Sequence, residues 1–183
     1  MMGHINNLVV QMVREELGES GVASLFSAAG VESKTYQPEL IYPDEEFQAL
    51  FRGAQQVFGV DTETAEVAFA KFFVDISPRM FPAMFELAGS ARGLMERIPT
   101  IHQNFPAAAA QADYQEKVFV DESSPERLVL EYDSPNRLCT TMRHVATHVL
   151  DFYGEKGTVH ETACQKNGDP RCRIVVDFEQ QNA

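Results

Sequence analysis

The chain has 183 residues, which is the usual size of one domain with at most a small appendage. Hydrophobic residues make up 44% and charged residues 23% of it, and these ordinary values exclude long disordered or collagen-like sequences. The net charge of −12 argues against a surface for nucleic acids or anionic membranes. The chain also has no run of about 18 apolar residues, which is the length needed to span a bilayer.

The first half of the sequence has the apolar spacing of successive helices. Apolar residues recur every three or four positions over 5–17, and the pattern ends at Gly18, where we expect the helix to end. A second helix is predicted over 44–58, because Asp44 can serve as its N-cap and acidic residues fill its first turn.

Prolines divide the helical half further along. Asp61 or Thr62 should cap a third helix, and Pro78 and Pro82 should interrupt the chain after it. The next apolar stripe runs over 84–101, and Pro99 should kink or restart that helix because it has no backbone donor.

The second half changes from helical spacing to short β-type runs. Strands are predicted over 117–121 and 127–132, a helix over 138–153, and strands near 158–165 and 171–178. Helices followed by ββαββ indicate an α+β fold, with an N-terminal helical layer packed on a C-terminal antiparallel sheet.

Two places in the chain carry residues suited to holding a ligand. His102 follows the apolar seam of the helix over 84–101, so it is either a hydrogen-bonded core histidine or a metal ligand. Tyr132 and Ser134 alternate on a strand, which puts two hydroxyl groups on one face, and Arg137 follows them. This motif is either a cradle for a carboxylate or phosphate or an ordinary strand end with a Ser-Pro turn.

With these residues in place, the chain resembles the H-NOX family of haem-nitric oxide/oxygen-binding domains. The resemblance covers nearly all of 1–183, as one domain with a mainly helical part over 1–105 and a sheet part over 115–183. The segments that carry it are Gly3-x-Ile5-Asn6, Tyr42-Pro43-Asp44-Glu45-Glu46, Ala68-x-x-Lys71-Phe72-Phe73, Ile101-His102 and Tyr132-x-Ser134.

The resemblance implies a haem b site. His102 would be the proximal ligand of the iron, and Tyr132 and Ser134 would hold the haem propionates. The family pattern is Tyr-x-Ser-x-Arg, but here Asn136 stands at the arginine position and Arg137 comes one residue later. A shift of one residue turns a side chain to the other face of a strand, so either the turn brings Arg137 back or the propionates lose their guanidinium partner.

The three cysteines form a second feature. Seven residues separate Cys164 and Cys172, so a three-residue loop would place them side by side on paired strands, as a disulfide or as two ligands of one metal. Cys139 and His160 can complete a tetrahedral site, and the alternative is three buried thiols. Some proteobacterial H-NOX proteins have a zinc cluster of this composition, but their histidine stands three residues before the second cysteine, where this chain has Glu161.

The resemblance also bears on the choice of gas. Family members that bind O₂ have a tyrosine on the helix after the Tyr-x-Ser motif, and 138–149 contains none. The expected lining of the distal side is mostly apolar, as in the NO-selective subgroup, and consists of Ile5, Val9, Phe73, Thr141 and Val145.

The resulting hypothesis is a haem-based nitric oxide sensor without catalytic activity, in the cytoplasm of a bacterium. It would bind NO and CO, contact neither nucleic acid nor membrane, and signal to a separate histidine kinase or diguanylate cyclase. Three cysteines, which cannot all pair within the chain, agree with a reducing compartment. One alternative is a redox sensor based on zinc and cysteine, and another is a haem-free vinyl-reductase-type module that binds a small ligand.

Overall fold

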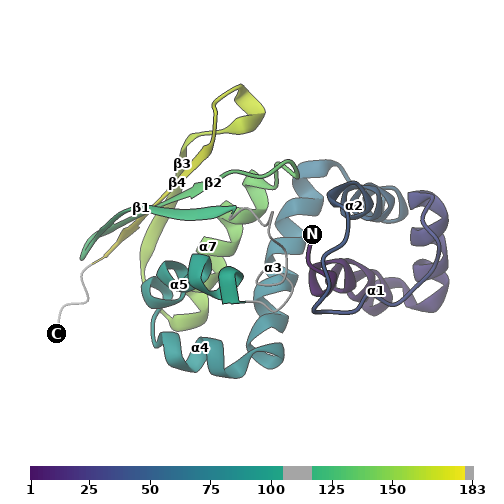
Figure 1. Ribbon diagram of the computed structural model, residues 1–183, viewed down its shortest axis with the longest axis horizontal. Helices are drawn as coiled ribbons and strands as arrows, with labels where there is room; N and C mark the ends of the chain where they lie inside the picture. Colours follow the sequence, from purple (N-terminus) through teal and green to yellow (C-terminus); the bar gives the residue numbers. More distant parts are fainter. Residues whose placement is uncertain (105–116, 180–183) are drawn as a thin grey trace. The chain divides into compact units, whose positions relative to one another are not determined.

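The computed structural model describes residues 1–104 and 117–179 and has the predicted α+β architecture (Figure 1). These residues form two compact units. The first comprises Met1–Phe69, and the second comprises Ala70–Asn104 together with the described residues from Lys117 onward. The assignment of 1–183 to one domain stays a prediction.

The first unit consists mainly of two long helices that pack against each other, α1 (Gly3–Ala29) and α2 (Asp44–Phe58). Their backbones approach closely at Gly53, because a Cβ added there would lie 2.9 Å from the carbonyl oxygen of Leu25. The prediction that the first helical stretch ends at Gly18 is confirmed. Gly18 adopts a φ of 69°, which breaks the helix, but the chain resumes its helical course and continues to Ala29.

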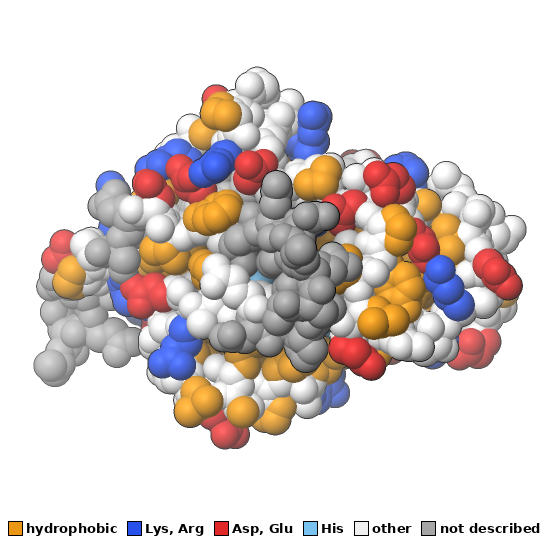
Figure 2. Space-filling model, viewed as in Figure 1, with side chains coloured by type: hydrophobic (Ala, Val, Ile, Leu, Met, Phe, Trp, Pro, Cys, Tyr) orange, Lys and Arg blue, Asp and Glu red, His pale blue; other side chains and the backbone are white. Residues whose placement is uncertain are grey.

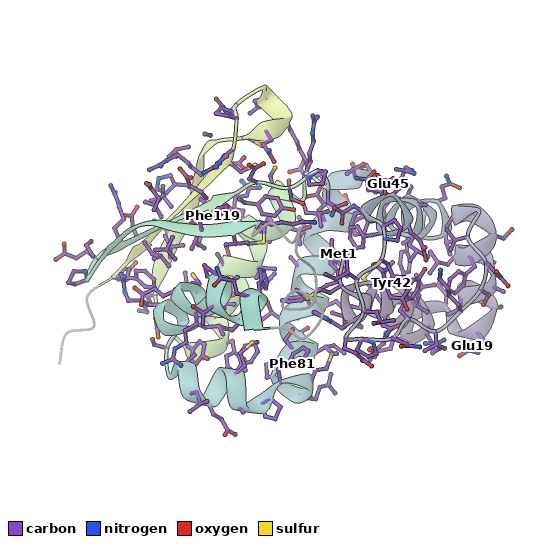
Figure 3. The ribbon with its side chains drawn as sticks, in the orientation of Figure 1. Met1, Glu19, Tyr42, Glu45, Phe81 and Phe119 are labelled. Carbon is purple, nitrogen blue, oxygen red and sulfur yellow. The ribbon has the colours of Figure 1, made fainter. Side chains whose placement is uncertain are left out.

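Polar contacts fasten the start of the chain to the start of α2. The amino group of Met1 donates to the carbonyl oxygen of Tyr42 and pairs with the carboxylate of Asp44 at 2.7 Å (Figure 3). The prediction of Asp44 as the N-cap was therefore wrong, because Pro43 occupies that position and Asp44 is the first helical residue.

The remaining helices are α3 (Thr62–Met80), α4 (Pro82–Ala88) and α5 (Ala91–Asn104). The cap at Asp61 is confirmed, since its carboxylate accepts a hydrogen bond from the amide of Thr64 at 2.7 Å. Pro78 lies inside α3 and does not interrupt the chain as expected, and Pro99 lies inside α5 and does not start a new helix. The break after α4 is made by Gly89, whose φ of 68° ends the helix ten residues before Pro99.

The sheet belongs to the second unit and has the strand order β1-β2-β4-β3, with every neighbouring pair antiparallel. Its strands are β1 (Val118–Ser124), β2 (Arg127–Tyr132), β3 (Gly157–Ala163) and β4 (Cys172–Phe178). The crossover helix α7 (Cys139–Tyr153) joins β2 to β3, as the ββαββ pattern predicts.

One hydrophobic core joins this sheet to its helices. Alternate residues of β2 and β4 point into it, and the other face of these strands carries both charged side chains and the buried pair Val129 and Val175. Helices α5 and α7 both contact the sheet and each other (Figure 1). The buried members of the core are Val74, Phe85, Ala91, Leu94, Met95, Leu128, Leu130, Ala146, Val149, Leu150, Ile174 and Val176.

The opposite face of the sheet carries paired charges. Basic and acidic side chains gather above the β1–β2 edge in Figure 2, beside Phe119, which Figure 3 labels. Arg173 bridges Asp121 and Glu131 at 2.7 and 3.0 Å, and Arg171 pairs with Glu131 at 2.9 Å. Both arginines are therefore held in ion pairs on this face. None of the described helices is long and apolar enough to cross a membrane.

Candidate functional site

His102 lies in the last turn of α5 and is half-buried. The residue before it, Ile101, packs against the hydrophobic core, and so do Phe73 of α3 and Val145 of α7. Because α5 contacts α7 and β1, the imidazole stands at the end of a helix that is held on its apolar side. That the imidazole itself faces an apolar interior stays a prediction.

Tyr132 and Ser134 come together at the end of β2. Both are buried, with 5% and 2% of their surface exposed. Burial raises the pKa of the Tyr132 phenol, while hydrogen bonds from the Ser134 hydroxyl and the Leu138 backbone lower it. The two hydroxyl groups are therefore adjacent, as the alternation along the strand predicts.

Asn136 and Arg137 lie in a tight turn after Ser134. The amide of Arg137 donates to the carbonyl oxygen of Ser134 at 3.1 Å, and the amide of Asn136 donates to the Ser134 hydroxyl at 3.3 Å. Arg137 has a φ of 50°, the only positive value at a non-glycine residue among the described parts of the chain. This conformation is unfavourable for a side chain with a Cβ, so the turn itself holds Arg137 in it. The Arg137 side chain is exposed, and it makes no hydrogen bond or ion pair with the described residues.

The five residues predicted to line the distal side fall into both units. Phe73, Thr141 and Val145 belong to the second unit, together with His102 and the Tyr-x-Ser motif, whereas Ile5 and Val9 belong to the first. Thr141 and Val9 are buried, and the other three are half-buried. The second unit alone thus brings together most of the predicted haem-site residues.

The three cysteines converge although they come from different elements. Cys139 begins α7, Cys164 follows β3 and Cys172 begins β4, and all three are buried and not oxidised. The Sγ atoms of Cys139 and Cys172 are 2.6 Å apart. The three thiols and one carboxylate oxygen of Glu161 all lie within 4.8 Å of one another.

The structure places Glu161, and not His160, beside the cysteines. His160 is exposed on the opposite face of β3, where its Nδ1 is 3.8 Å from a carboxylate oxygen of Asp177. Neighbouring residues of a strand point to opposite faces, so the two side chains cannot exchange roles without a slip of β3. The positions of these side chains therefore favour Glu161 over His160 as the candidate fourth donor beside the thiols. The alternation of Val159 with Glu161, both on the core face, is the sequence signal that indicates this residue.

The chemistry of the cluster suits a metal cation. Burial raises the pKa of the Cys139 thiol and of the Cys172 thiol, so both stay protonated at neutral pH unless a cation stabilises the thiolates. The backbone amide of Gln165 already donates to the Sγ of Cys172 at 3.3 Å, which favours a negatively charged sulfur. The residues present therefore fit a thiophilic divalent ion such as Zn²⁺.

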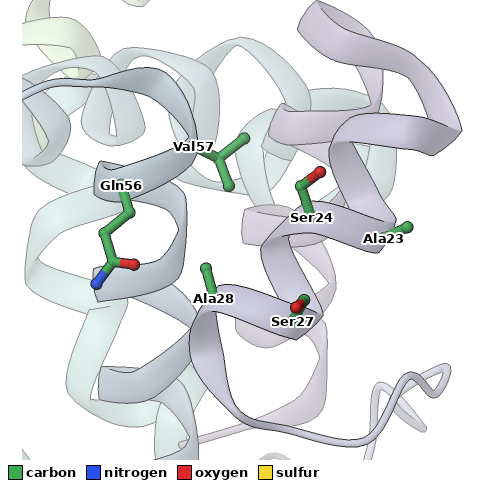
Figure 4. Close-up of a pocket in the computed structure, with 6 residues that line it drawn as sticks. All are labelled: Ala23, Ser24, Ser27, Ala28, Gln56 and Val57. Carbon is green, nitrogen blue, oxygen red and sulfur yellow. The ribbon is translucent and has the colours of Figure 1, made fainter.

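The first unit offers a groove with different properties. It lies between α1 and α2 and is open to solvent (Figure 4). Its lining contains no charged or metal-ligating side chain, so it is a weak candidate for chemistry. The lining residues are Ala23, Ser24, Ser27, Ala28, Gln56 and Val57.

Comparison with protein families bears on whether this domain binds haem. The family model described as haem-NO-binding matches residues 2–161, which is most of the chain. The chain belongs to the H-NOX family. This is a family of haem-binding gas sensors, so the match favours the haem interpretation over a haem-free vinyl-reductase-type module.

Solved H-NOX structures have the same fold as this H-NOX domain. A protein from S. oneidensis in the Fe(II)NO state has a TM-score of 0.83 at 16% identity, with 98% of this chain and 100% of that chain covered. An oxygen-binding H-NOX domain related to soluble guanylate cyclases, in its oxygen complex, has a TM-score of 0.81 at 15% identity, with 98% and 96% covered. A mutant from K. algicida has a TM-score of 0.78 at 12% identity, with 100% and 98% covered. A search of curated proteins found no match.

The donor groups of the second unit fit haem. One imidazole at a helix end can ligate iron, and two adjacent hydroxyl groups can donate to the propionate carboxylates. Phe73 and Val145 offer apolar contact for a porphyrin on the same core. The residues that would hold haem in this H-NOX domain are therefore His102, Tyr132 and Ser134.

Proposed function

We propose that this H-NOX domain is a nitric oxide sensor that binds NO and CO and forms no stable complex with O₂. The supporting observation is that α7 provides no free phenol. Its single tyrosine, Tyr153, is the last residue of the helix, and its hydroxyl donates to the carbonyl oxygen of Phe85 at 2.7 Å. Oxygen binding to ferrous haem is favoured by a hydrogen-bond donor beside it, whereas NO binds tightly without one.

The chain's own residues have distinct roles in this proposal. When bound, haem b supplies the ferrous iron to which a diatomic gas binds. His102 ligates that iron, and Tyr132 and Ser134 donate to the propionates. Arg137, which its turn holds in a left-handed conformation, supplies positive charge beside them. Phe73, Thr141 and Val145 provide the part of the mostly apolar lining that belongs to the second unit.

The proposed output is a signal to another protein, and the domain itself is not an enzyme. The partner is a histidine kinase or a diguanylate cyclase in the bacterial cytoplasm, and nucleic acids and membranes are not partners of this acidic chain. Signalling requires that the partner bind the gas-bound and gas-free domain with different affinity. Helix α5 is the element proposed to transmit the change, because it carries His102 and contacts both α7 and β1.

The second proposed cofactor is a zinc ion bound by Cys139, Cys164 and Cys172. Its role is structural, because the three sulfur ligands come from the start of α7, the end of the β3 region and the start of β4. A metal at this position would tie the crossover helix to the last hairpin.

Absorption spectra of the ferrous protein test the gas preference. We expect distinct NO and CO complexes and an unchanged ferrous spectrum on brief exposure to air-saturated buffer, followed only by slow oxidation. Tyr153→Phe is the matched control and should behave as the wild type, because that hydroxyl is bound to Phe85. A persistent O₂ complex that Thr141→Val abolishes would show that Thr141 supplies the donor, and the proposed selectivity would be wrong.

A further inference from the structure

One oxygen of the Glu161 carboxylate is buried without a hydrogen-bond partner, although the residue as a whole is half-buried. Its Oε1 atom is inaccessible to solvent and has no hydrogen-bond partner. A buried carboxylate oxygen without a donor or a cation is costly, and such atoms are rare in folded proteins. The nearest chemistry is the group of three cysteine thiols, whose ligand atoms lie within 4.8 Å of this carboxylate and of one another.

The backbone of β3 explains why Glu161 faces the thiols. Glu161 pairs with Ile174 of β4, which is a core residue, whereas His160 pairs with Val175 on the charged face. The ladder is irregular between Glu161 and Ala163, directly after Glu161. Such an irregularity changes the direction of the strand before Cys164. The Glu161 carboxylate and the Cys164 thiol then both lie on the side of the sheet where α7 begins at Cys139.

We propose that Glu161 is the fourth ligand of the zinc ion, so that this H-NOX domain has a Cys₃Glu site. A tetrahedron around zinc with Zn–S bonds of ~2.3 Å has edges of about 3.8 Å, so ligand atoms within 4.8 Å of one another need only small movements to close on the ion. The inference rests on the proposed zinc site and departs from the Cys₃His composition that the resemblance implies. Three thiolates and one carboxylate close the coordination sphere, as in structural zinc sites.

Replacing the imidazole by a carboxylate changes the charge of the site. Three thiolates and a neutral histidine around Zn²⁺ carry one negative charge, whereas three thiolates and a carboxylate carry two. The backbone amide of Gln165 donates to the Sγ of Cys172, so its dipole favours negative charge on the cluster. The backbone amide of Cys164 donates to the carboxylate of Asp169 beside the cluster.

The test measures zinc affinity in the full chain. Wild type, Glu161→Gln, Glu161→His and the matched control His160→Gln are reduced, stripped of metal and titrated with zinc against a chromophoric chelator. Removal of a ligand should weaken binding at least about tenfold, because even a residue that only supports a ligand is worth 10- to 100-fold. We therefore expect Glu161→Gln to lose at least tenfold in affinity, His160→Gln to change less than twofold, and Glu161→His to recover most of the loss.

Zinc X-ray absorption of the wild type gives a readout that needs no variant to fold. Three sulfur atoms and one oxygen without imidazole scattering would support the proposal, and imidazole scattering or four sulfur atoms would overturn it. Wild-type affinity in Glu161→Gln would also overturn it while leaving the proposed zinc site intact. Absence of zinc from the reduced wild type would overturn both, and neither result touches haem binding, which the spectrum of the same sample reports separately.

Discussion

The second unit contains two candidate ligand sites of opposite character. Around His102 the imidazole is half-buried at the end of a helix, and the predicted lining residues are contributed by several elements. Around Cys139, Cys164 and Cys172 every sulfur is buried, and four ligand atoms already converge. Closed tetrahedral sites hold an ion for stability, whereas sites with an open position exchange ligands. The contrast supports the proposal that the cysteine cluster has a structural role and that the histidine site responds to gas.

The two sites are nevertheless joined by one short segment. Tyr132 of β2 pairs directly with Cys172 of β4 in the sheet register, and the turn after Ser134 leads to Cys139 within five residues. A metal bound to the cysteines therefore braces both ends of the proposed propionate-binding turn. Each site can be perturbed separately, and the size of the effect at the other site measures how strongly they are coupled.

The largest expected effect is loss of haem ligation. His102→Gly should abolish the Soret band of the ferrous protein, because the iron loses its only protein ligand in the proposed site. Added imidazole should restore the band by occupying the space of the deleted side chain. The measurement is an absorption spectrum of the variant purified with and without imidazole, with zinc content determined on the same sample.

His148→Gly is the matched control for that variant. His148 lies on α7, where its Nδ1 is 3.6 Å from the carboxylate of Asp151, so its removal should leave the Soret band unchanged. An unchanged spectrum in His102→Gly, or a lost band in His148→Gly, would contradict the assignment.

Loss of a zinc ligand should have the next largest effect. Cys172→Ala should reduce the zinc content from one ion per chain to none and weaken protection from hydrogen exchange in β3 and β4. The thermal midpoint should fall by several degrees, since each 1 kcal/mol corresponds to about 2–4 °C in a domain of this size. The haem spectrum should stay largely intact because His102 is untouched.

Arg171→Ala provides the control in the same hairpin. Arg171 is exposed and pairs with Glu131, and exposed ion pairs contribute roughly 0–1 kcal/mol, so zinc content should not change. Full zinc retention in Cys172→Ala would reduce the cluster to buried thiols. A strong loss of haem in that variant would show that the metal braces the propionate-binding turn.

The smallest expected effect concerns the shifted arginine. Arg137→Ala should speed transfer of haem to apomyoglobin by roughly two- to fivefold, as expected for one partly exposed charged contact worth about 0.5–1 kcal/mol. Asn136→Ala, one residue earlier, should change the rate less. Equal rates in wild type and Arg137→Ala would show that the propionates have no guanidinium partner.

The sequence predicted most elements of the second unit because their signals are local. Alternating apolar residues gave the four strands within a few residues of their observed ends, and the apolar stripe over 138–153 gave α7. The wrong helix boundaries lie where a local sequence rule was outweighed by other contacts. Pro99 stays inside α5, and Gly89 makes the break that was expected at the proline. The resemblance to H-NOX proteins was also visible from the chain alone, and the family match confirms it.

The sequence by itself thus determined the fold class, the family and the position of His102 and the Tyr-x-Ser pair, because those features depend on spacing along single elements. Only the tertiary structure decided which acidic or imidazole side chain joins the cysteines. That choice depends on which face of β3 packs against the core. Either face of a strand can do so until its pairing with neighbouring strands fixes the register. The pairing of Glu161 with Ile174 places the carboxylate beside the thiols and leaves His160 with Asp177 in solvent.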